Sequence, residues 1–171
     1  MAYIIDSGGG MEVFWGPGAK ERFEAALGRK DSASPEDQTA RETVGDKMAD
    51  GTVYAGISPD TGKRMYTTPR DARLMLIFNK GNFTFNKAKD YAAKLDASGH
   101  QDWRVPTKGE LGVLFTNRAA IGGFNISGSI PAGWYWSSSQ LHDYNAWAQR
   151  FSDGGQIINY RLNASSLRCV R

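Results

Sequence analysis

The chain has 171 residues, 40% of them apolar and 12% aromatic, so it suits one ordinary domain with a short extension better than a disordered chain. Its net charge of +3 is small, and the basic residues are spread along the chain rather than gathered in one stripe. Nucleic-acid binding through phosphate neutralisation needs a denser basic patch, so we expect no nucleic-acid partner.

The cysteine content and the lack of long apolar runs argue against further classes of protein. Cys169 has no partner for an intrachain disulfide or a thiolate metal cluster, and we expect it to be a buried apolar residue. Residues 1–6 show no basic region followed by an apolar stretch, and no run of about 18 apolar residues occurs. We therefore expect no membrane span and no classical secretion signal. A role at a surface would then need a virion or another export route.

Residues 1–46 are predicted to form an N-terminal extension or arm. A short helix is expected at 19–27 and would end at Gly28, because glycine is common just past the last helical residue. From Arg29 to Asp46 almost all residues are charged or small and polar. Such a segment cannot bury much apolar surface, which indicates a linker or a loosely docked arm.

The domain proper is expected to span residues 47–171 and to begin with two strands. The segments 52–57 and 64–68 contain the β-branched and aromatic residues that are typical of strands. Residues 58–62 between them include the proline, aspartate and glycine of a turn. The sequence therefore predicts two strands joined by this turn.

Two helices are predicted next. Thr84 is a candidate N-cap for a helix over 84–95, in which the apolar residues fall on one stripe. A second helix follows residues 103–106, where Thr107 and Glu110 have the spacing of a capping box. Both segments also have the apolar face that a helix needs to pack on a sheet.

After Gly122 the pattern changes from helical to strand-like. Short runs that alternate or are wholly apolar predict strands at 134–136, 146–151, 156–162 and 167–170. Two helices followed by a block of short antiparallel strands are typical of an α+β domain, which is the fold class that we predict.

Residues that could carry catalysis or hold a metal are scattered. His100 and His142 are the only histidines and lie in different predicted elements, and residues 137–139 lack the glycines of a nucleophile elbow. Four aspartates lie in or near turns, where this residue is common for backbone reasons: Asp60, Asp102, Asp143 and Asp153. We therefore expect no catalytic residue, no metal and no cofactor, and a protein that binds rather than one that catalyses.

Three motifs between residue 50 and residue 171 resemble one known family. They are Asp102-Trp103-Arg104-Val105-Pro106-Thr107, Gly133-Trp134-Tyr135-Trp136-Ser137-Ser138-Ser139 and Leu167-Arg168-Cys169-Val170-Arg171. In these motifs the chain is similar to the lectin-like C-terminal domain family of bacterial collagen-like adhesins, which has structural relatives among formylglycine-generating-enzyme-like binding domains. The resemblance implies a C-type-lectin-like fold, with two helices packed on a small twisted antiparallel sheet.

The chemistry of the enzymatic and calcium-dependent relatives does not carry over. A formylglycine-generating enzyme works through a pair of cysteines, whereas this chain has only Cys169, and the Glu-Pro-Asn and Trp-Asn-Asp signatures of calcium-dependent lectins are absent. Aromatic residues held in motifs belong to a core more often than to a binding platform, although a platform stays open. We assign five of them to the scaffold: Trp103, Trp134, Trp136, Trp147 and Phe151.

The last part of the chain has a narrower resemblance, to the variable region of proteins that a diversity-generating retroelement diversifies. Such elements copy a template while mutating adenines, so an AAC codon can become any NNC codon, and NNC cannot encode Lys, Glu, Gln, Met or Trp. Two unpatterned blocks, 141–145 and 155 with 157–160, 162 and 163, contain twelve residues that all belong to the NNC set, and Arg161 is reachable from a mutated Lys codon. The residues between and beside them include Trp147, Gln149 and Gln156, as expected of a fixed scaffold.

We therefore predict a ligand-contact surface made by both blocks. Its residues are Leu141, His142, Asp143, Tyr144, Asn145, Gly155, Ile157, Ile158, Asn159, Tyr160, Arg161, Leu162 and Asn163. A tight turn at 152–155 would bring the second block back beside the first and place both on one exposed face, with Trp147 and Phe151 directed into the core. The partner would be a protein or a glycan on a cell or another surface.

Alternatives stay open at this point. A fixed adhesin or lectin-like domain of the same fold could bind a glycan or a matrix polymer without any diversification. An uncharacterised enzyme is a more remote alternative, and a block such as 141–145 is also what a plain solvated loop would contain.

Overall fold

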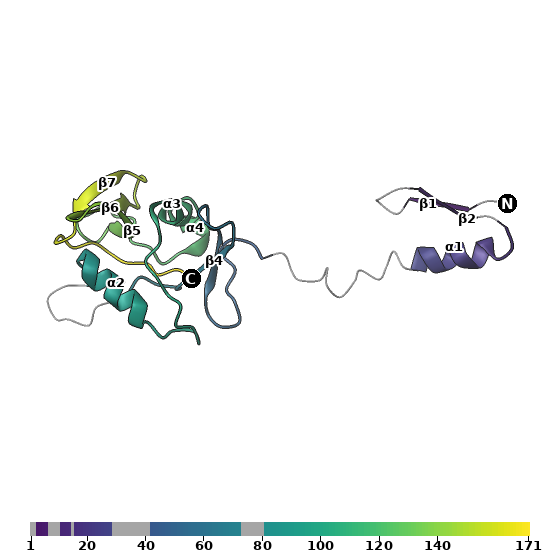
Figure 1. Cartoon of the computed structure of the whole chain (residues 1–171), viewed down its shortest axis with the longest axis horizontal. Coiled ribbons are helices and arrows are strands. Elements are labelled where there is room, and N and C mark those ends of the chain that lie inside the picture. The colour runs from purple at the N-terminus through teal and green to yellow at the C-terminus, as the bar shows by residue number, and fades with distance from the viewer. Residues whose placement is uncertain (1–2, 7–10, 15, 29–41, 73–80) are drawn as a thin grey trace. The chain divides into compact units, whose positions relative to one another are not determined.

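The computed structural model describes residues 3–6, 11–14, 16–28, 42–72 and 81–171. The chain divides into two compact units, residues 1–42 and residues 43–171. Figure 1 labels the helices and strands of each unit. The expected linker lies outside the described residues over 29–41.

The first unit contains two short strands and a helix. β1 (Tyr3–Asp6) and β2 (Met11–Phe14) pair antiparallel, and α1 (Ala19–Gly28) follows them. The helix confirms the prediction at 19–27. The two strands are not predicted from the sequence, because four residues are too few for a period of two to stand out.

The second unit is an α+β domain, as predicted. β3 (Val53–Ile57) and β4 (Arg64–Thr67) pair antiparallel across the predicted turn. Three helices follow, and the last three strands form an antiparallel sheet in the order β5–β6–β7. These elements are α2 (Phe85–Lys94), α3 (Lys108–Thr116), α4 (Arg118–Ile121), β5 (Trp134–His142), β6 (Asn145–Arg150) and β7 (Gln156–Tyr160).

Residues 43–46 belong to this second unit, whereas the sequence pattern places them in the preceding arm. The N–H of Gly45 donates a hydrogen bond to the carbonyl of Tyr54, and the N–H of Tyr54 donates to the carbonyl of Asp46, each at 2.9 Å. Val44 packs against a buried cluster of the domain. These contacts tie the entry of the domain to β3.

The ends of the helices follow the predicted signals in part. Thr107 and Glu110 form the predicted capping box, in which each side chain accepts a hydrogen bond from the backbone N–H of the other residue. Thr84 occupies the N-cap position of α2, but its side chain makes no capping hydrogen bond. α4 is not predicted from the sequence, because it is a single turn that follows α3 directly after Asn117.

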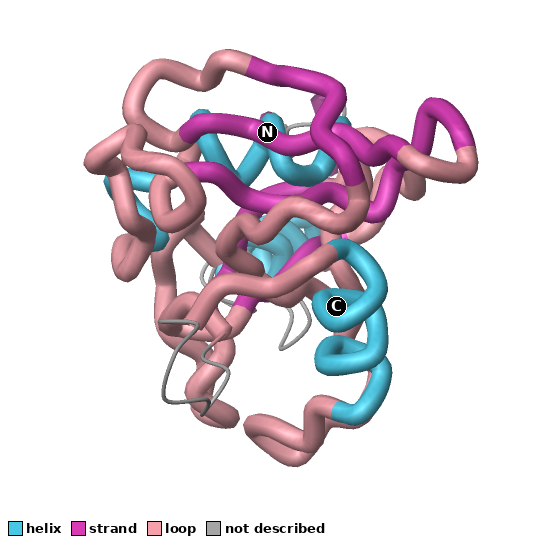
Figure 2. Tube along the Cα trace, turned by 90° about the vertical axis from the view of Figure 1, so that its left-hand side faces the viewer, coloured by secondary structure: helices cyan, strands magenta, loops and turns pink. Residues whose placement is uncertain are grey.

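The side chains of the three-stranded sheet contribute to two clusters of buried residues. Figures 1 and 2 show the course of the strands and helices that carry them. Side chains alternate between the two faces of a strand, and residues paired across strands share a face. Trp136 and Ala148 are paired and belong to the cluster that contains the buried side of α2. Tyr135 points the other way and belongs to the cluster that contains Leu111 and Leu114 of α3. We call the two sides the α2 face and the α3 face.

The prediction of a strand at 167–170 is wrong. This segment makes isolated bridges to different neighbours, and Val170 alone bridges both Thr67 and Arg104. A β-ladder needs successive residues paired with one neighbouring strand, and here the neighbour changes along the chain. The segment is therefore an extended crossing rather than a member of a sheet.

This C-terminal crossing contributes to both buried clusters. Leu167 and Cys169 lie in the cluster on the α2 side, and Val170 lies in the cluster on the α3 side. Cys169 is fully buried, as expected, and burial raises the pKa of its thiol to about 12. The last residues of the chain thus join the two halves of the core.

Arg168 lies fully buried in the middle of this crossing. Its Nε donates a hydrogen bond to Oδ1 of Asp71 at 2.9 Å, and its Nη1 donates to the carbonyl of Thr68 at 2.8 Å. The guanidinium carbon lies 3.8 Å from the centroid of the Phe124 ring, and the hydroxyl of Tyr135 donates to the second oxygen of Asp71 at 2.6 Å. Burial raises the pKa of Asp71, although the charge of Arg168 opposes this shift.

Replacing Arg168 tests how much this buried charge pair contributes to the stability of the domain. Arg168→Met keeps most of the side-chain volume but leaves Asp71 without its counter-charge, so we expect the free energy of unfolding to fall by about 3–5 kcal/mol. Arg171→Met is the matched control, because Arg171 pairs with the exposed Asp102 and should cost at most about 1 kcal/mol. Chemical denaturation of both variants measures the difference, and equal stability of the two would contradict the assigned role of Arg168.

Candidate functional site

The predicted contact residues lie at the tip of the β5–β6 hairpin and along β7. Of the thirteen, nine are exposed, four are half-buried and none is buried. Tyr144 is 78% exposed, Tyr160 is 66% exposed and Leu162 is 89% exposed. Such large apolar areas in water are uncommon for residues that serve only the fold, so their position is informative.

The two blocks converge through the backbone, as the predicted hairpin requires. β6 and β7 are antiparallel, and Asn145 at the start of β6 is paired with Tyr160 at the end of β7. The N–H of Arg161 donates a hydrogen bond to the carbonyl of Tyr144 at 2.9 Å. The tip of the β5–β6 hairpin therefore lies beside the C-terminal end of β7.

The expectation that all these side chains share one face is wrong. Because side chains alternate along β7, the register places Ile158 and Tyr160 on the α3 face, with Trp147 and Asn145 of β6. Ile157 and Asn159 lie on the α2 face, opposite Ala148 and Ala146. β7 is the outermost strand of the described sheet. Its free edge therefore borders both the α3-face side chains and the α2-face side chains of this strand.

Arg161 is held by the fold and is not free for a ligand. Its Nη1 donates a hydrogen bond to the carbonyl of Asp143 at 2.6 Å, and its Nη2 donates to Oδ1 of Asn86 in α2 at 2.5 Å. The guanidinium carbon also lies 4.8 Å from the centroid of the Phe85 ring. This side chain ties the hairpin tip to α2, which is a role that the codon pattern does not reveal.

The expectation that Trp147 is directed into the core is wrong. It is half-buried and belongs to neither buried cluster, whereas Trp103, Trp134, Trp136 and Phe151 are buried. Ala146 and Ala148 occupy the core side of β6, so the strand period directs Trp147 to the opposite, α3 face. The Nζ of Lys108, at the start of α3, lies 3.3 Å from the centroid of the Trp147 ring. The aromatic ring thus forms part of the surface beside Ile158.

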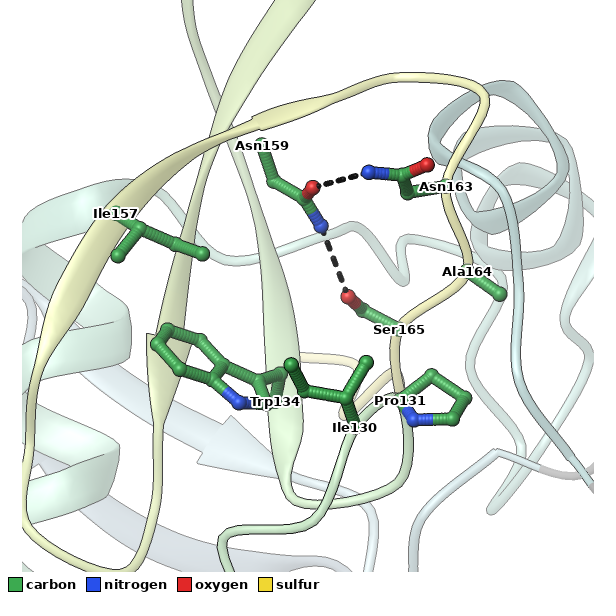
Figure 3. A pocket seen from close by; sticks show the side chains of 8 residues that line it. All are labelled: Ile130, Pro131, Trp134, Ile157, Asn159, Asn163, Ala164 and Ser165. Atoms are coloured by element: carbon green, nitrogen blue, oxygen red, sulfur yellow. Dashed lines mark hydrogen bonds between the residues drawn. The ribbon is translucent and has the colours of Figure 1, made fainter.

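A cavity of about 370 Å³ opens on the α2 face beside β7. Figure 3 shows Ile157 and Asn159 of β7 on one side of it and Ile130 and Pro131 on the other, with Trp134 between them. Its remaining lining residues are Asn163, Ala164 and Ser165. The cavity is therefore walled by apolar side chains, with a short polar strip along one rim.

The polar strip of this cavity is internally paired. Nδ2 of Asn163 donates a hydrogen bond to Oδ1 of Asn159 at 2.7 Å, and Nδ2 of Asn159 lies 3.5 Å from Oγ of Ser165 (Figure 3). The indole Nε1 of Trp134, by contrast, is buried and has no hydrogen-bond partner. An unpaired buried donor is uncommon in folded proteins and calls for an explanation.

Several surface residues of this region are missed by sequence reasoning. Ile130 is 80% exposed and borders the cavity, but it lies in a loop that has no period to indicate a face. Lys108 and Asn86 contact the predicted site from the starts of two helices. A weak signal for the loop is the apolar pair Ile130-Pro131 inside a stretch of glycine and serine.

The buried charges elsewhere in the domain are explained by the fold. Glu110 is fully buried and receives hydrogen bonds from both terminal nitrogens of Arg104, at 2.5 and 2.7 Å, and from Ser58 at 2.6 Å. Burial alone would raise the pKa of Glu110, but these bonds outweigh it and the pKa is lowered. In the described part of the chain, no group of three His, Cys, Asp or Glu residues could hold a metal ion.

Comparison with known proteins identifies one family. Residues 60–171 match the family model described as the Lcl C-terminal domain, which covers all three motifs noted in the sequence. No curated protein matches the chain. Across the described residues, no helix has the length and apolar character needed to cross a membrane.

The exposed and buried positions should differ sharply in their tolerance of substitution. Combined replacement of Tyr144, Tyr160 and Leu162 by Ala should change the free energy of unfolding by no more than about 0.5 kcal/mol for each residue, because these side chains are exposed. Trp136→Ala should cost about 3–5 kcal/mol, since Trp136 is fully buried and its removal leaves a cavity. Thermal and chemical denaturation measure both, and a triple variant that loses as much as Trp136→Ala would show that these residues hold the fold.

Proposed function

Because the chain belongs to the Lcl C-terminal domain family through residues 60–171, we propose that it is a ligand-binding, adhesin-type protein and not an enzyme. It contacts a macromolecule through the tip of the β5–β6 hairpin and the free edge of β7. A diversity-generating retroelement varies the residues of this contact surface while the rest of a C-type-lectin-like scaffold stays constant.

One observation carries this proposal. The codon pattern selects thirteen residues without any reference to structure, and none of the thirteen is buried. The segment that separates the two blocks contains Ala146, Ala148, Gln149 and Phe151, all of which are buried. Of these four residues only Gln149 is a type that a mutated AAC codon cannot produce, so the support comes from exposure: the thirteen selected residues lie where variation would disturb the core least.

The α3 face of this surface has the composition of a recognition site. Ile158 is paired with Trp147, and Tyr160 is paired with Asn145, so the four side chains lie next to one another on one face. Tyrosine and tryptophan give a large contact area with few rotatable bonds, which is why binding surfaces favour them. Tyr144 at the hairpin tip, 78% exposed, extends this surface beyond the sheet.

The backbone that carries these residues is held by contacts that do not need their side chains. β7 is paired with β6 over five residues, and Tyr144 is linked to Arg161 through main-chain atoms. Arg161 is the exception, because its side chain ties the tip to Asn86 of α2. A surface built in this way can change its side chains without losing its shape, as a diversified binding site requires.

A fixed adhesin or lectin-like domain is the second candidate function. It is favoured by family membership, which does not depend on any codon pattern. In that case the same exposed aromatic residues would bind one glycan or matrix polymer, and their identity would be constant among copies of the gene.

Sequencing the DNA around the gene separates the two candidates. Diversification predicts a nearby reverse-transcriptase gene and a near-copy of the DNA that encodes residues 141–163. The near-copy should carry AAC at the codons for 141–145, 155, 157–160, 162 and 163, and an adenine-containing Lys codon at 161.

The codons for Trp147, Gln149 and Gln156 are the internal control, because they should be identical in the gene and the near-copy. A locus without a reverse transcriptase and without a near-copy would contradict diversification and leave the fixed adhesin. Differences spread evenly over constant and predicted variable codons would also contradict it.

A further inference from the structure

The cavity beside β7 combines residues of two kinds. Trp134 cannot arise from a mutated AAC codon and is 7% exposed, so it forms a constant part of the lining. Ile157, Asn159 and Asn163 belong to the predicted variable set and line the same cavity. A pocket with a constant floor and variable walls is suited to selecting one group of a ligand.

The Trp134 nitrogen marks where a ligand acceptor would bind. The indole nitrogens of the other two buried tryptophans are paired, that of Trp136 with the carbonyl of Phe83 at 2.7 Å and that of Trp103 with the carbonyl of Ala97 at 3.1 Å. Nε1 of Trp134 alone among these three has no partner. In Figure 3 this nitrogen lies on the edge of the ring that faces Ile130.

The side chain of Ile130 borders the same cavity as Trp134. It is 80% exposed, so a change of its rotamer gives up few packing contacts. A hydrogen-bond acceptor that paired with this N–H from the cavity would remove the penalty of a buried donor without a partner.

The charges near Trp134 favour a neutral acceptor. The guanidinium carbon of Arg150 lies 5.3 Å from the centroid of the Trp134 ring, but its nitrogens donate two hydrogen bonds to the carboxylate of Asp153, at 2.8 and 2.5 Å. This pairing neutralises the cation locally. A carboxylate ligand would therefore gain little there, and a carbonyl oxygen fits better.

The walls favour an apolar group over a sugar. Two hydrogen bonds among Asn159, Asn163 and Ser165 occupy part of their donors and acceptors, and these three residues form only one rim of the lining. Ile130, Pro131, Ile157 and the Trp134 ring supply the rest of the lining. Burying an aliphatic or aromatic side chain against them is favourable through the hydrophobic effect.

The edge of β7 explains how a polypeptide could present such a group. No other strand of the described sheet pairs with the outer edge of β7. An extended peptide can add to an open edge through main-chain hydrogen bonds, and its alternate side chains then lie on one face of the sheet. Ile157 and Asn159 lie on the face where the cavity opens, so that side chains on this face of an added peptide would be directed toward it.

We propose that this cavity is a specificity pocket that takes an apolar side chain of a protein ligand, with a neutral backbone carbonyl accepting the hydrogen bond of Trp134 Nε1. The proposal rests on the ligand-binding function proposed above and names the ligand class for one part of the contact surface. In this version of the chain Ile157 makes the wall apolar. A different residue at 157 would select a different side chain.

The test is a titration of the whole chain with small probes. The indole N–H resonances in ¹H–¹⁵N NMR spectra report binding. The chain has five tryptophans, and Trp134→Phe assigns the resonance of Trp134. The probes are a capped pentapeptide with a central leucine between serines and threonines, the same peptide with a central serine, and methyl glycosides of common hexoses. We expect the leucine peptide to shift the Trp134 resonance saturably, and the serine peptide to bind at least about tenfold more weakly.

Two exposed isoleucines, one in β7 and one in β3, provide matched variants. Ile157→Asp places a charge in the wall of the cavity and should weaken the leucine peptide at least about tenfold, by removing apolar contact and burying a charge. Ile57 is about as exposed as Ile157, at 48% against 40%, but lies in β3 and outside the proposed contact surface, so Ile57→Asp should leave the binding unchanged. A small loss of folding stability would be common to both variants.

Several outcomes would overturn the proposal. They are a saturable shift with a methyl glycoside and none with the leucine peptide, an equal response to the leucine and serine peptides, an equal loss in both variants, or no shift of Trp134 at all. Each of these leaves the DNA test of diversification unaffected, so failure of the pocket and failure of the proposed function can be told apart.

Discussion

The burial of Arg168 in the C-terminal crossing is the constraint on which the domain depends. A guanidinium without water is costly unless its charge and its donors are satisfied, and here Asp71, Thr68 and Phe124 satisfy them from an earlier part of the chain. Because these partners must be in place for Arg168 to be buried, the crossing fixes the relative position of the two buried clusters. The backbone of Ser166 is also hydrogen-bonded to β5 on both sides of Tyr135, which locates the three-stranded sheet.

The anchored part of the sheet and the proposed contact residues belong to different parts of the strands. β5 is anchored at its Trp134 end by the crossing, β6 is central, and β7 is free at its outer edge. Burial falls along β5 from Trp134, which is buried, to His142, which is exposed. The first block of proposed variable positions therefore lies at the end of the sheet farthest from the anchored core, whereas the second follows the outer strand β7 from near the Trp134 end to the hairpin tip. Only Arg161 among them carries a structural tie to α2.

Local signals in the sequence predicted local structure well, and tertiary contacts explain the failures. The spacing of Thr107 and Glu110 was enough for the start of α3, because a capping box involves only neighbouring residues. The prediction for Trp147 was wrong because its neighbours on both sides are alanines. In such an apolar run the sequence does not indicate which alternate residues face the core. The role of Arg168 depends on Asp71, 97 residues away, and no pattern along the chain indicates such a partner. The cavity beside β7 was missed for the same reason, since Ile130 and Ile157 meet only in the folded domain.

The central claim is that the side chains at the hairpin tip and along the edge of β7 can change without loss of the fold, whereas the buried residues of the scaffold cannot. A scan of all single substitutions over residues 134–171, scored by resistance of the displayed protein to proteolysis, tests it most directly. We expect broad tolerance at Leu141–Tyr144, Ile158, Tyr160, Leu162 and Asn163. We expect little tolerance at Trp136, Ala148, Phe151 and Arg168, and an intermediate result at Arg161. Tolerance that is uniform along the segment, or lowest at the tip and at the edge of β7, would contradict it.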